Sequence, residues 1–262
     1  MRILEPLNPP LRDWRGVRVW LVGASTGIGA ALARTLAARG ARLALSARDE
    51  ERLVALAADC PGSLALPMDV TRGVAEFARV RDPVLAAWGG IDVVILNAGT
   101  YQPMRAWELE PDAVRSTLAV NLLGVIDGAT SVVPTLLAQG RGAIAIVGSV
   151  AAYHGLPQAA AYGPSKAALV NFAESLYLDL APRGVAVHLV SPGFVATRLT
   201  AQNRFAMPAL IQPEDAAAEI VAGFARGDFE THFPRRFTSI MKLLRILPYG
   251  LSFPLVRRAT GA

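Results

Sequence analysis

"VRVWLVGASTGIGAALARTLAA", residues 17–38, passes from an apolar run through a glycine-rich turn into an alanine-rich stretch. The apolar run predicts a buried strand, and the alanine-rich stretch predicts a helix that begins at the turn. Glycines at such a junction let the backbone approach a pyrophosphate, whose charge the free N–H groups of the helix N-terminus stabilise. The stretch therefore predicts the first strand–turn–helix unit of a nucleotide-binding fold, with a purely structural glycine turn as the alternative.

The same alternation continues along the chain. Short runs rich in Val, Ile and Leu predict further strands at residues 41–47, 63–68, 91–96, 142–148 and 184–190. Helices are predicted between them, at residues 28–39, 49–58, 72–88, 111–138 and 160–181, and again from Pro213. Alternating strands and helices imply a parallel sheet with helices on both faces. We therefore expect a Rossmann-like, doubly wound α/β fold whose ligands bind beyond the carboxyl ends of the strands.

The length of 262 residues fits one large α/β domain. We assign residues 17–233 to this catalytic domain, residues 1–16 to an N-terminal extension and residues 234–262 to a basic amphipathic C-terminal extension. The single cysteine, Cys60, excludes an internal disulfide and fits a reducing compartment. Residues 1–16 lack the apolar core of a signal peptide, so a cytoplasmic location is expected.

Positive charge is concentrated at the end of the chain. Residues 231–262 contain no acid and six basic residues: Arg235, Arg236, Lys242, Arg245, Arg257 and Arg258. Because the whole chain carries +5 and this tail +6, residues 1–230 sum to −1. A nucleic-acid-binding domain would carry its basic stripe across the body, so no nucleic-acid partner is expected. No metal site is predicted either.

The second predicted strand ends without the acid that commonly binds the ribose hydroxyls of NAD. It reads Ser46-Ala47-Arg48, and the first acid is Asp49. Ala47 leaves room, and Arg48 can make charge-assisted hydrogen bonds to a 2′-phosphate, so NADP(H) is preferred over NAD(H). The alternative is that Arg48 is a solvated surface residue.

Asp69 ends "PMDV" beside Val70 and has two equal interpretations. Its carboxylate could accept a hydrogen bond from the adenine amino group. It could equally cap the helix that follows, because Asp is a favoured N-cap residue.

A tyrosine and a lysine lie four residues apart in a predicted helix, at Tyr162 and Lys166. Residues at this spacing share one face of a helix. A free phenol has a pKa of about 10, and a nearby ammonium lowers it and so favours proton transfer near neutral pH. Ser149 ends the strand before this helix, where its hydroxyl could donate to the substrate oxygen that Tyr162 protonates.

These residues, together with several ordered motifs, resemble the short-chain dehydrogenase/reductase family. The motifs span about residues 17–230 and read "GASTGIG", "MDV", "LNAG", "VNLLG", "VGSVAAYHGLPQAAAYGPSK" and "SPGFVAT". The resemblance implies that Tyr162 is the general acid/base, that Lys166 lowers its pKa and holds the nicotinamide ribose, and that Ser149 binds the substrate oxygen. It also implies that Asn121 kinks its long helix and anchors a water for proton exchange; the residue alone would be interpreted as a satisfied buried amide.

The resemblance further implies a cofactor site formed by the strand ends. Its residues would be Gly23, Ser25, Thr26, Gly27, Ile28, Gly29, Arg48, Asp69, Val70, Asn97, Ala98, Gly99, Tyr162, Lys166, Pro192, Gly193, Val195 and Thr197. Two positions depart from the family pattern, because Val22 and Leu96 stand where polar residues are common. These two apolar residues cannot form the local hydrogen bonds of the polar residues they replace, but they leave the predicted catalytic residues unchanged.

The substrate side is expected to be largely apolar, which points to a hydrophobic ketone or secondary alcohol. Its candidate residues are Ser149, Ala151, His154, Tyr162 and Phe194, with Tyr101, Leu156 and the segment 198–211 around them. His154 is also consistent with a simple loop histidine.

The basic tail has two interpretations: packing on the body or on a second subunit, and contact with an anionic membrane surface. The leading function is therefore an NADP(H)-dependent short-chain dehydrogenase/reductase, expected as a homodimer or homotetramer. The alternatives are a membrane-associated lipid or oxoacyl reductase and a non-catalytic dinucleotide-binding sensor.

Overall fold

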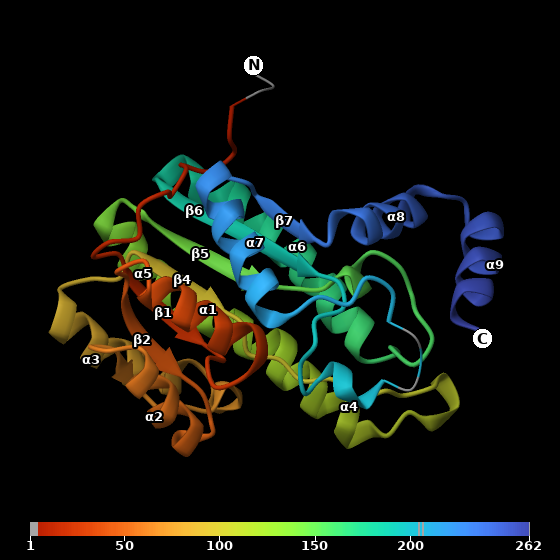
Figure 1. Ribbon diagram of the computed structural model, residues 1–262, viewed down its shortest axis with the longest axis horizontal. Coiled ribbons are helices and arrows are strands. Elements are labelled where there is room, and N and C mark those ends of the chain that lie inside the picture. The colour runs from red at the N-terminus through yellow and green to blue at the C-terminus, as the bar shows by residue number, and fades with distance from the viewer. Residues whose placement is uncertain (1–4, 204, 206, 262) are drawn as a thin grey trace.

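The computed structural model describes residues 5–203, 205 and 207–261. Its centre is a seven-stranded sheet with the order β3-β2-β1-β4-β5-β6-β7 (Figure 1), and every neighbouring pair is parallel. The strands are β1 Arg18–Val22, β2 Arg42–Ser46, β3 Leu64–Ala65, β4 Val93–Leu96, β5 Gly142–Val147, β6 Val185–Pro192 and β7 Glu230–Phe233. The predicted Rossmann-like, single-domain fold is confirmed.

Helices cover both faces of this sheet (Figure 1). They are α1 Gly27–Ala37, α2 Glu50–Asp59, α3 Val74–Trp88, α4 Pro111–Leu118, α5 Gly124–Gln139, α6 Tyr162–Leu180, α7 Pro213–Arg226, α8 Arg235–Ile246 and α9 Tyr249–Thr260. One apolar core lies between the sheet and α1, α2 and α7. The other core lies on the opposite face, beneath α3, α5 and α6.

The strand order reverses beside β1. This strand pairs with β2 on one side and β4 on the other, and its last residue, Val22, aligns with Ser46 and Leu96. The chain winds outward from this point in both directions, so the helices α1 and α5, which follow β1 and β4, lie on opposite faces of the sheet and leave a crevice beyond the strand ends. The sheet thereby brings the glycine-rich turn next to the "NAG" segment.

The long helix predicted at residues 111–138 is interrupted. A π-helical segment, Ala119–Leu123, separates α4 from α5 and contains Asn121. The whole run, 111–139, is long enough to span a membrane, and its most apolar 18-residue window has a mean hydropathy of 1.5. Half of its most apolar window is buried inside the protein, as in a core helix.

Two strands differ from their sequence-based predictions. The strand predicted at residues 63–68 is reduced to β3, which ends just before Leu66 and Pro67. The strand β7 was not predicted, because "ETHF" is short and mostly polar. Its Thr231 and Phe233 are buried, and its pairing with β6 completes the edge of the sheet.

The N-terminal extension contributes to the core. Trp14 is buried in the cluster beneath α1 and α7. Asn8 is also buried, and its side-chain amide donates to Val187 O at 2.8 Å and accepts from Val187 N at 3.2 Å. This pairing ties the start of the chain to β6.

Candidate active site

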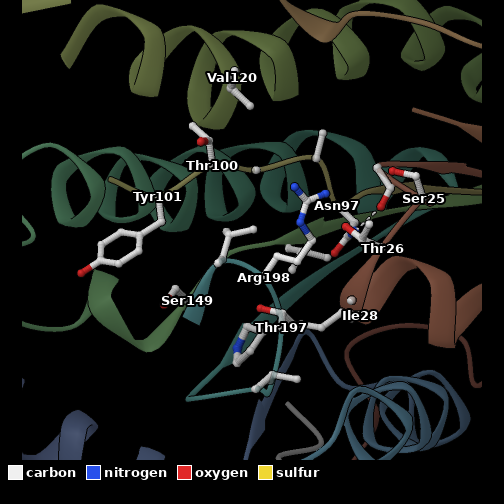
Figure 2. Close-up of a pocket in the computed structure, with 18 of the residues that line it drawn as sticks. Ser25, Thr26, Ile28, Asn97, Thr100, Tyr101, Val120, Ser149, Thr197 and Arg198 are labelled. Carbon is white, nitrogen blue, oxygen red and sulfur yellow. Dashed lines mark hydrogen bonds between the residues drawn. The ribbon is translucent and has the colours of Figure 1, made fainter. Parts of the chain in front are cut away.

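A cleft of about 860 Å³ opens at the carboxyl ends of the strands. Figure 2 shows Ser25, Thr26 and Ile28 at one end of it and Tyr101 and Ser149 at the other. The cleft therefore extends from the glycine-rich turn to the predicted catalytic residues.

The glycine-rich turn depends on the absence of side chains. Gly23 has a φ of +86°, and a Cβ on it would lie 2.5 Å from Ala98 N. Asn97 Nδ2 donates to Gly23 O at 2.7 Å and so braces the turn against the segment that follows β4. Any larger residue at position 23 would push these two segments apart.

The N-terminus of α1 points its backbone N–H groups toward the cleft. Thr26 is the extended N-cap residue, with a φ of −152°, and its side chain makes no capping hydrogen bond within the described part of the chain. The first N–H groups of a helix have no partner inside the helix and attract anions. The turn and the helix terminus thus fit the pyrophosphate of a dinucleotide.

Arg48 lies at the same end of the cleft, just beyond β2. Ala47 before it is buried, and Arg48 itself is exposed. The acid that follows, Asp49, is engaged in capping α2, because its side chain accepts from Arg52 N at 3.1 Å. Arg48 takes part in no ion pair among the described residues, so it offers a cation at this end of the cleft.

Asp69 acts as a cap in this structure. Its Oδ1 accepts from Thr71 N at 3.0 Å and from Thr71 Oγ1 at 2.8 Å. Burial alone would raise the pKa of its carboxyl, but the Thr71 hydrogen bonds and the charges of Arg48 and Arg72 lower it overall. Of the two interpretations left open by the sequence, the geometry corresponds to the helix cap.

Tyr162 begins α6, and Lys166 lies one turn further along it; both line the cleft. Lys166 Nζ is 5.8 Å from the centre of the Tyr162 ring and donates to Val147 O at 2.9 Å. Ser149 follows β5, and its Oγ accepts from Ala151 N at 3.2 Å. The three side chains predicted to be catalytic therefore meet where β5 ends and α6 begins.

The pKa of the Tyr162 phenol is raised, mainly by burial, although its hydrogen bond with Ser149 acts in the lowering direction. This is opposite to the lowering by Lys166 predicted from the sequence, because desolvation of the phenolate outweighs other influences in this geometry. Burial also lowers the pKa of Lys166 to about 8. The pair thus favours a protonated phenol beside an ammonium that titrates just above neutral pH.

Asn121 lies behind the cleft in the π-helical segment and is fully buried. Its Oδ1 accepts from Thr100 N at 2.7 Å, and its Nδ2 donates to Thr100 O at 2.9 Å and to Ser165 Oγ at 3.2 Å. The geometry shows the satisfied amide and the interrupted helix that the sequence indicated. It holds the segment after "NAG" against α6.

Most residues predicted for the cofactor site line the cleft: Gly23, Ser25, Thr26, Gly27, Ile28, Arg48, Val70, Asn97, Ala98, Gly99, Pro192, Gly193, Val195 and Thr197. Others lie outside its lining: Gly29, Asp69, Asn121, Ala151, His154, Leu156 and Phe194. In the predicted segment 198–211, Arg198 and Gln202 line the cleft, whereas residues 204 and 206 lie outside the described residues.

His154 and Phe194 face the C-terminal helices. The His154 ring lies 5.7 Å from Phe253 of α9, and its Nδ1 contacts Gly155 O at 2.9 Å. Phe194 lies 5.5 Å from Phe237 of α8. Substrate contact by these two residues stays a prediction, since the structure places both in the wall behind the cleft.

Several lining residues were missed by the sequence analysis. They include Met68, Thr100, Val120, Val147 and Gly148. Four of them stand inside a quoted motif and Thr100 directly follows one, so their position at the strand ends was the available signal. Arg198, predicted only as part of a longer segment, projects across the middle of the cleft near Thr197 in Figure 2.

The fold and the cleft define a doubly wound nucleotide-binding protein with a Ser-Tyr-Lys group at one end of its site. A family model described as short chain dehydrogenase matches residues 18–207. An uncharacterized oxidoreductase of Myxococcus xanthus is 37% identical over 242 residues, covering 91% of this chain and 95% of the relative. This chain therefore belongs to the short-chain dehydrogenase/reductase family and is an oxidoreductase of that family.

Solved structures agree with this assignment. A short chain dehydrogenase of Burkholderia cenocepacia in complex with NADP has a TM-score of 0.82 and 27% identity, and the match covers 93% of this chain and 99% of that one. A short chain dehydrogenase/reductase of Burkholderia phymatum in complex with NAD has a TM-score of 0.81 and 24% identity, with 89% and 94% covered. The second structure, with its lower sequence identity, is evidence for the shared fold only.

Proposed function

We propose that this protein is an NADP(H)-dependent oxidoreductase acting on a hydrophobic ketone or the corresponding secondary alcohol. The observation that carries the cofactor choice is Arg48, an exposed cation lining the adenosine end of the cleft directly after the buried Ala47. A guanidinium can bind the 2′-phosphate that distinguishes NADP from NAD with paired hydrogen bonds.

The residues at the other end of the cleft support reduction of a carbonyl group. A bound reduced nicotinamide supplies the hydride. The raised pKa of Tyr162 keeps its phenol protonated at neutral pH, as a proton donor to the carbonyl oxygen requires. Ser149 donates a hydrogen bond to the same oxygen, and the Lys166 ammonium stabilises the phenolate that forms.

Apolar and aromatic side chains around this end favour a hydrophobic substrate. Tyr101 packs edge-on against Tyr162, with ring centres 5.0 Å apart, and Leu199 also lines the cleft. Beyond them, Phe194 contacts Phe205 at 5.8 Å.

A second candidate is a membrane-associated reductase of lipid or oxoacyl substrates. One observation favours it: the large apolar side chains of α8 and α9 that remain exposed, such as Ile246 and Tyr249.

A cytoplasmic location and assembly as a homodimer or homotetramer stay predictions, which cell fractionation and light scattering would test.

Replacing Arg48 tests the cofactor choice. In Arg48→Ala we expect the dissociation constant for NADPH to rise about tenfold or more, because one or two charge-assisted hydrogen bonds are lost. The constant for NADH stays as in the wild type, since NADH lacks the 2′-phosphate. Both constants are measured by fluorescence titration, and Arg39→Ala serves as the matched exposed arginine outside the cleft.

An unchanged ratio of NADPH to NADH affinity in Arg48→Ala would refute the role of Arg48.

The wild-type protein is also given saturating NADPH and a panel of apolar ketones. Tight NADPH binding without turnover of any ketone would indicate the non-catalytic sensor, and turnover that Tyr162→Phe abolishes would support the reductase.

A further inference from the structure

The two C-terminal helices each pack on the protein with one face and leave other apolar side chains exposed. The buried faces carry Thr238 and Met241 in α8 and Ser252 and Val256 in α9. The exposed side chains, between 50% and 77% accessible, form what we call the C-terminal apolar surface: Ile240, Leu243, Ile246, Tyr249, Leu251, Phe253 and Leu255. Exposed apolar residues in such number on adjacent helices mark an interaction surface.

The helices that carry this surface are also basic. Lys242 is engaged with Glu230, at 2.6 Å. The five arginines of the tail take part in no ion pair among the described residues: Arg235, Arg236, Arg245, Arg257 and Arg258. Residues 231–262 contain no acid that could neutralise them.

The positive charge of the tail distinguishes between two candidate partners of this surface, a second copy of the chain and an anionic bilayer. In a symmetric dimer formed through this face, the same surface of both subunits would be in contact. The arginines of one subunit would then lie close to those of the other and repel them. An anionic bilayer instead attracts each exposed arginine near its surface, and it accepts the apolar side chains below its headgroups. A lipid surface is therefore the better complement.

The C-terminal apolar surface adjoins the substrate end of the cleft. Phe237 of α8 contacts Phe194, which in turn contacts Phe205. Phe253 of α9 contacts His154, five residues beyond Ser149. Figure 1 shows α8 leading away from β7 and α9 lying at the periphery of the molecule.

Two other segments at this end also expose apolar side chains. Trp107 and Leu109 precede α4, and Phe205 and Leu210 precede α7. Gln202 Nε2 donates to Tyr101 O at 3.2 Å and joins the bases of these two segments. In Figure 1 the segment before α4 lies on the same side of the view as α9.

We propose that the C-terminal apolar surface docks on an anionic lipid bilayer and that the ketone substrate is a membrane-dissolved lipid that enters the cleft from that side. The proposal rests on the proposed reductase function for its substrate, and on the exposed apolar and basic residues for its docking. The bound state holds the Tyr101–Ser149 end of the cleft near the headgroups, so a substrate need not cross water.

Vesicle sedimentation with the full-length protein tests the docking. We expect the wild type to bind vesicles of phosphatidylglycerol and phosphatidylcholine at least about tenfold more tightly than vesicles of phosphatidylcholine alone, because five arginines face the anionic headgroups. Leu243→Glu with Ile246→Glu removes this binding. Val54→Glu, a residue 55% exposed on α2, is the matched control and binds like the wild type.

Folding and chemistry are measured beside the binding. Leu243→Glu with Ile246→Glu keeps the wild-type unfolding temperature and its turnover of a water-soluble ketone, since neither residue contacts the cleft. Turnover of a long-chain ketone in the anionic vesicles falls to the rate without vesicles in this variant. A wild type that binds vesicles but reduces no ketone would overturn the proposed function and leave the docking intact.

Two results would overturn the docking itself. One is equal, weak binding of the wild type to both kinds of vesicle. The other is a lipid-free wild type that is a dimer by light scattering and that Leu243→Glu with Ile246→Glu converts to a monomer, which would make this surface a subunit interface.

Discussion

Lys166 and Lys242 are the two lysines of a chain with 26 basic residues of Lys and Arg type. Each approaches a tyrosine ring that flanks the Ser149 segment: Lys166 lies 5.8 Å from the Tyr162 ring, and Lys242 lies 5.7 Å from the Tyr153 ring. A compact ammonium on a flexible stem fits into the buried position of Lys166, where a planar guanidinium needs more room. The chain therefore has lysine, and not arginine, where the charged group lies inside the protein.

The titration of Lys166 predicts the pH dependence of reduction. Its pKa of about 8 means that the ammonium is lost as the pH rises through that value. We expect kcat/KM for ketone reduction to be level below pH 8 and to fall above it, while the phenol of Tyr162, whose pKa is raised, still carries its proton. Lys166→Gln, which has no ammonium to titrate, should show a lower kcat/KM that stays level across pH 8. An identical profile in both proteins would show that another group titrates.

At the scale of elements, α8 is held to the body by a polar network behind the Ser149 segment. The Glu230 carboxylate on β7 accepts hydrogen bonds from the Tyr153 hydroxyl and, at 2.7 Å, from Ser191 Oγ, and it pairs with Lys242 of α8. Burial would raise the pKa of Glu230, but these partners lower it overall. The carboxylate therefore stays ionised, and β7 connects α8 to the catalytic segment.

Breaking this network should destabilise the protein. We expect Lys242→Met to lower the free energy of unfolding by about 1–2 kcal/mol, because it leaves a largely buried carboxylate without its cation, while the partial exposure of Lys242 limits the loss. Lys242→Arg recovers most of the stability. Urea denaturation measures both variants, and Arg257→Met, at an exposed site of the same tail, is the control. Equal stability of Lys242→Met and wild type would contradict this role.

At the scale of the whole molecule, the N-terminal segment and the far edge of the sheet meet at His188. This residue lies in β6, and its Nδ1 contacts Asp228 O at 2.7 Å and Asn8 Nδ2 at 3.5 Å. Burial lowers its pKa from 6.5 to about 4. The imidazole is thus neutral in the folded protein over the pH range where an exposed histidine gains a proton.

This depressed pKa predicts a loss of stability in mild acid. Below pH 6.5 the unfolded chain binds a proton that the folded chain does not, so the stabilisation present above pH 6.5 is lost as the pH falls toward 4. From pH 7 to pH 5 we expect the wild type to lose about 1–2 kcal/mol through this group. His188→Gln, compared by urea denaturation at both pH values, should show a smaller decrease. The same decrease in both proteins would assign the effect to other groups.

Much of the fold followed from local patterns. The strand before "GASTGIG", the helix after it and the parallel arrangement were predictable because apolar periodicity and glycine placement act within a few residues. The edge strand β7 was not, since "ETHF" becomes a strand only by pairing with β6. The same reason explains Trp14, whose burial depends on α1 and α7 lying beside it.

The sequence by itself determined the family, the doubly wound sheet and the types of residue at the cleft, because ordered motifs at strand ends must converge once a parallel sheet forms. Only the tertiary structure decided that the pKa of Tyr162 is raised, that Asp69 serves as a cap, and that His154 faces α9. Those outcomes depend on desolvation and on contacts between segments distant in the chain, which no local pattern of residues specifies.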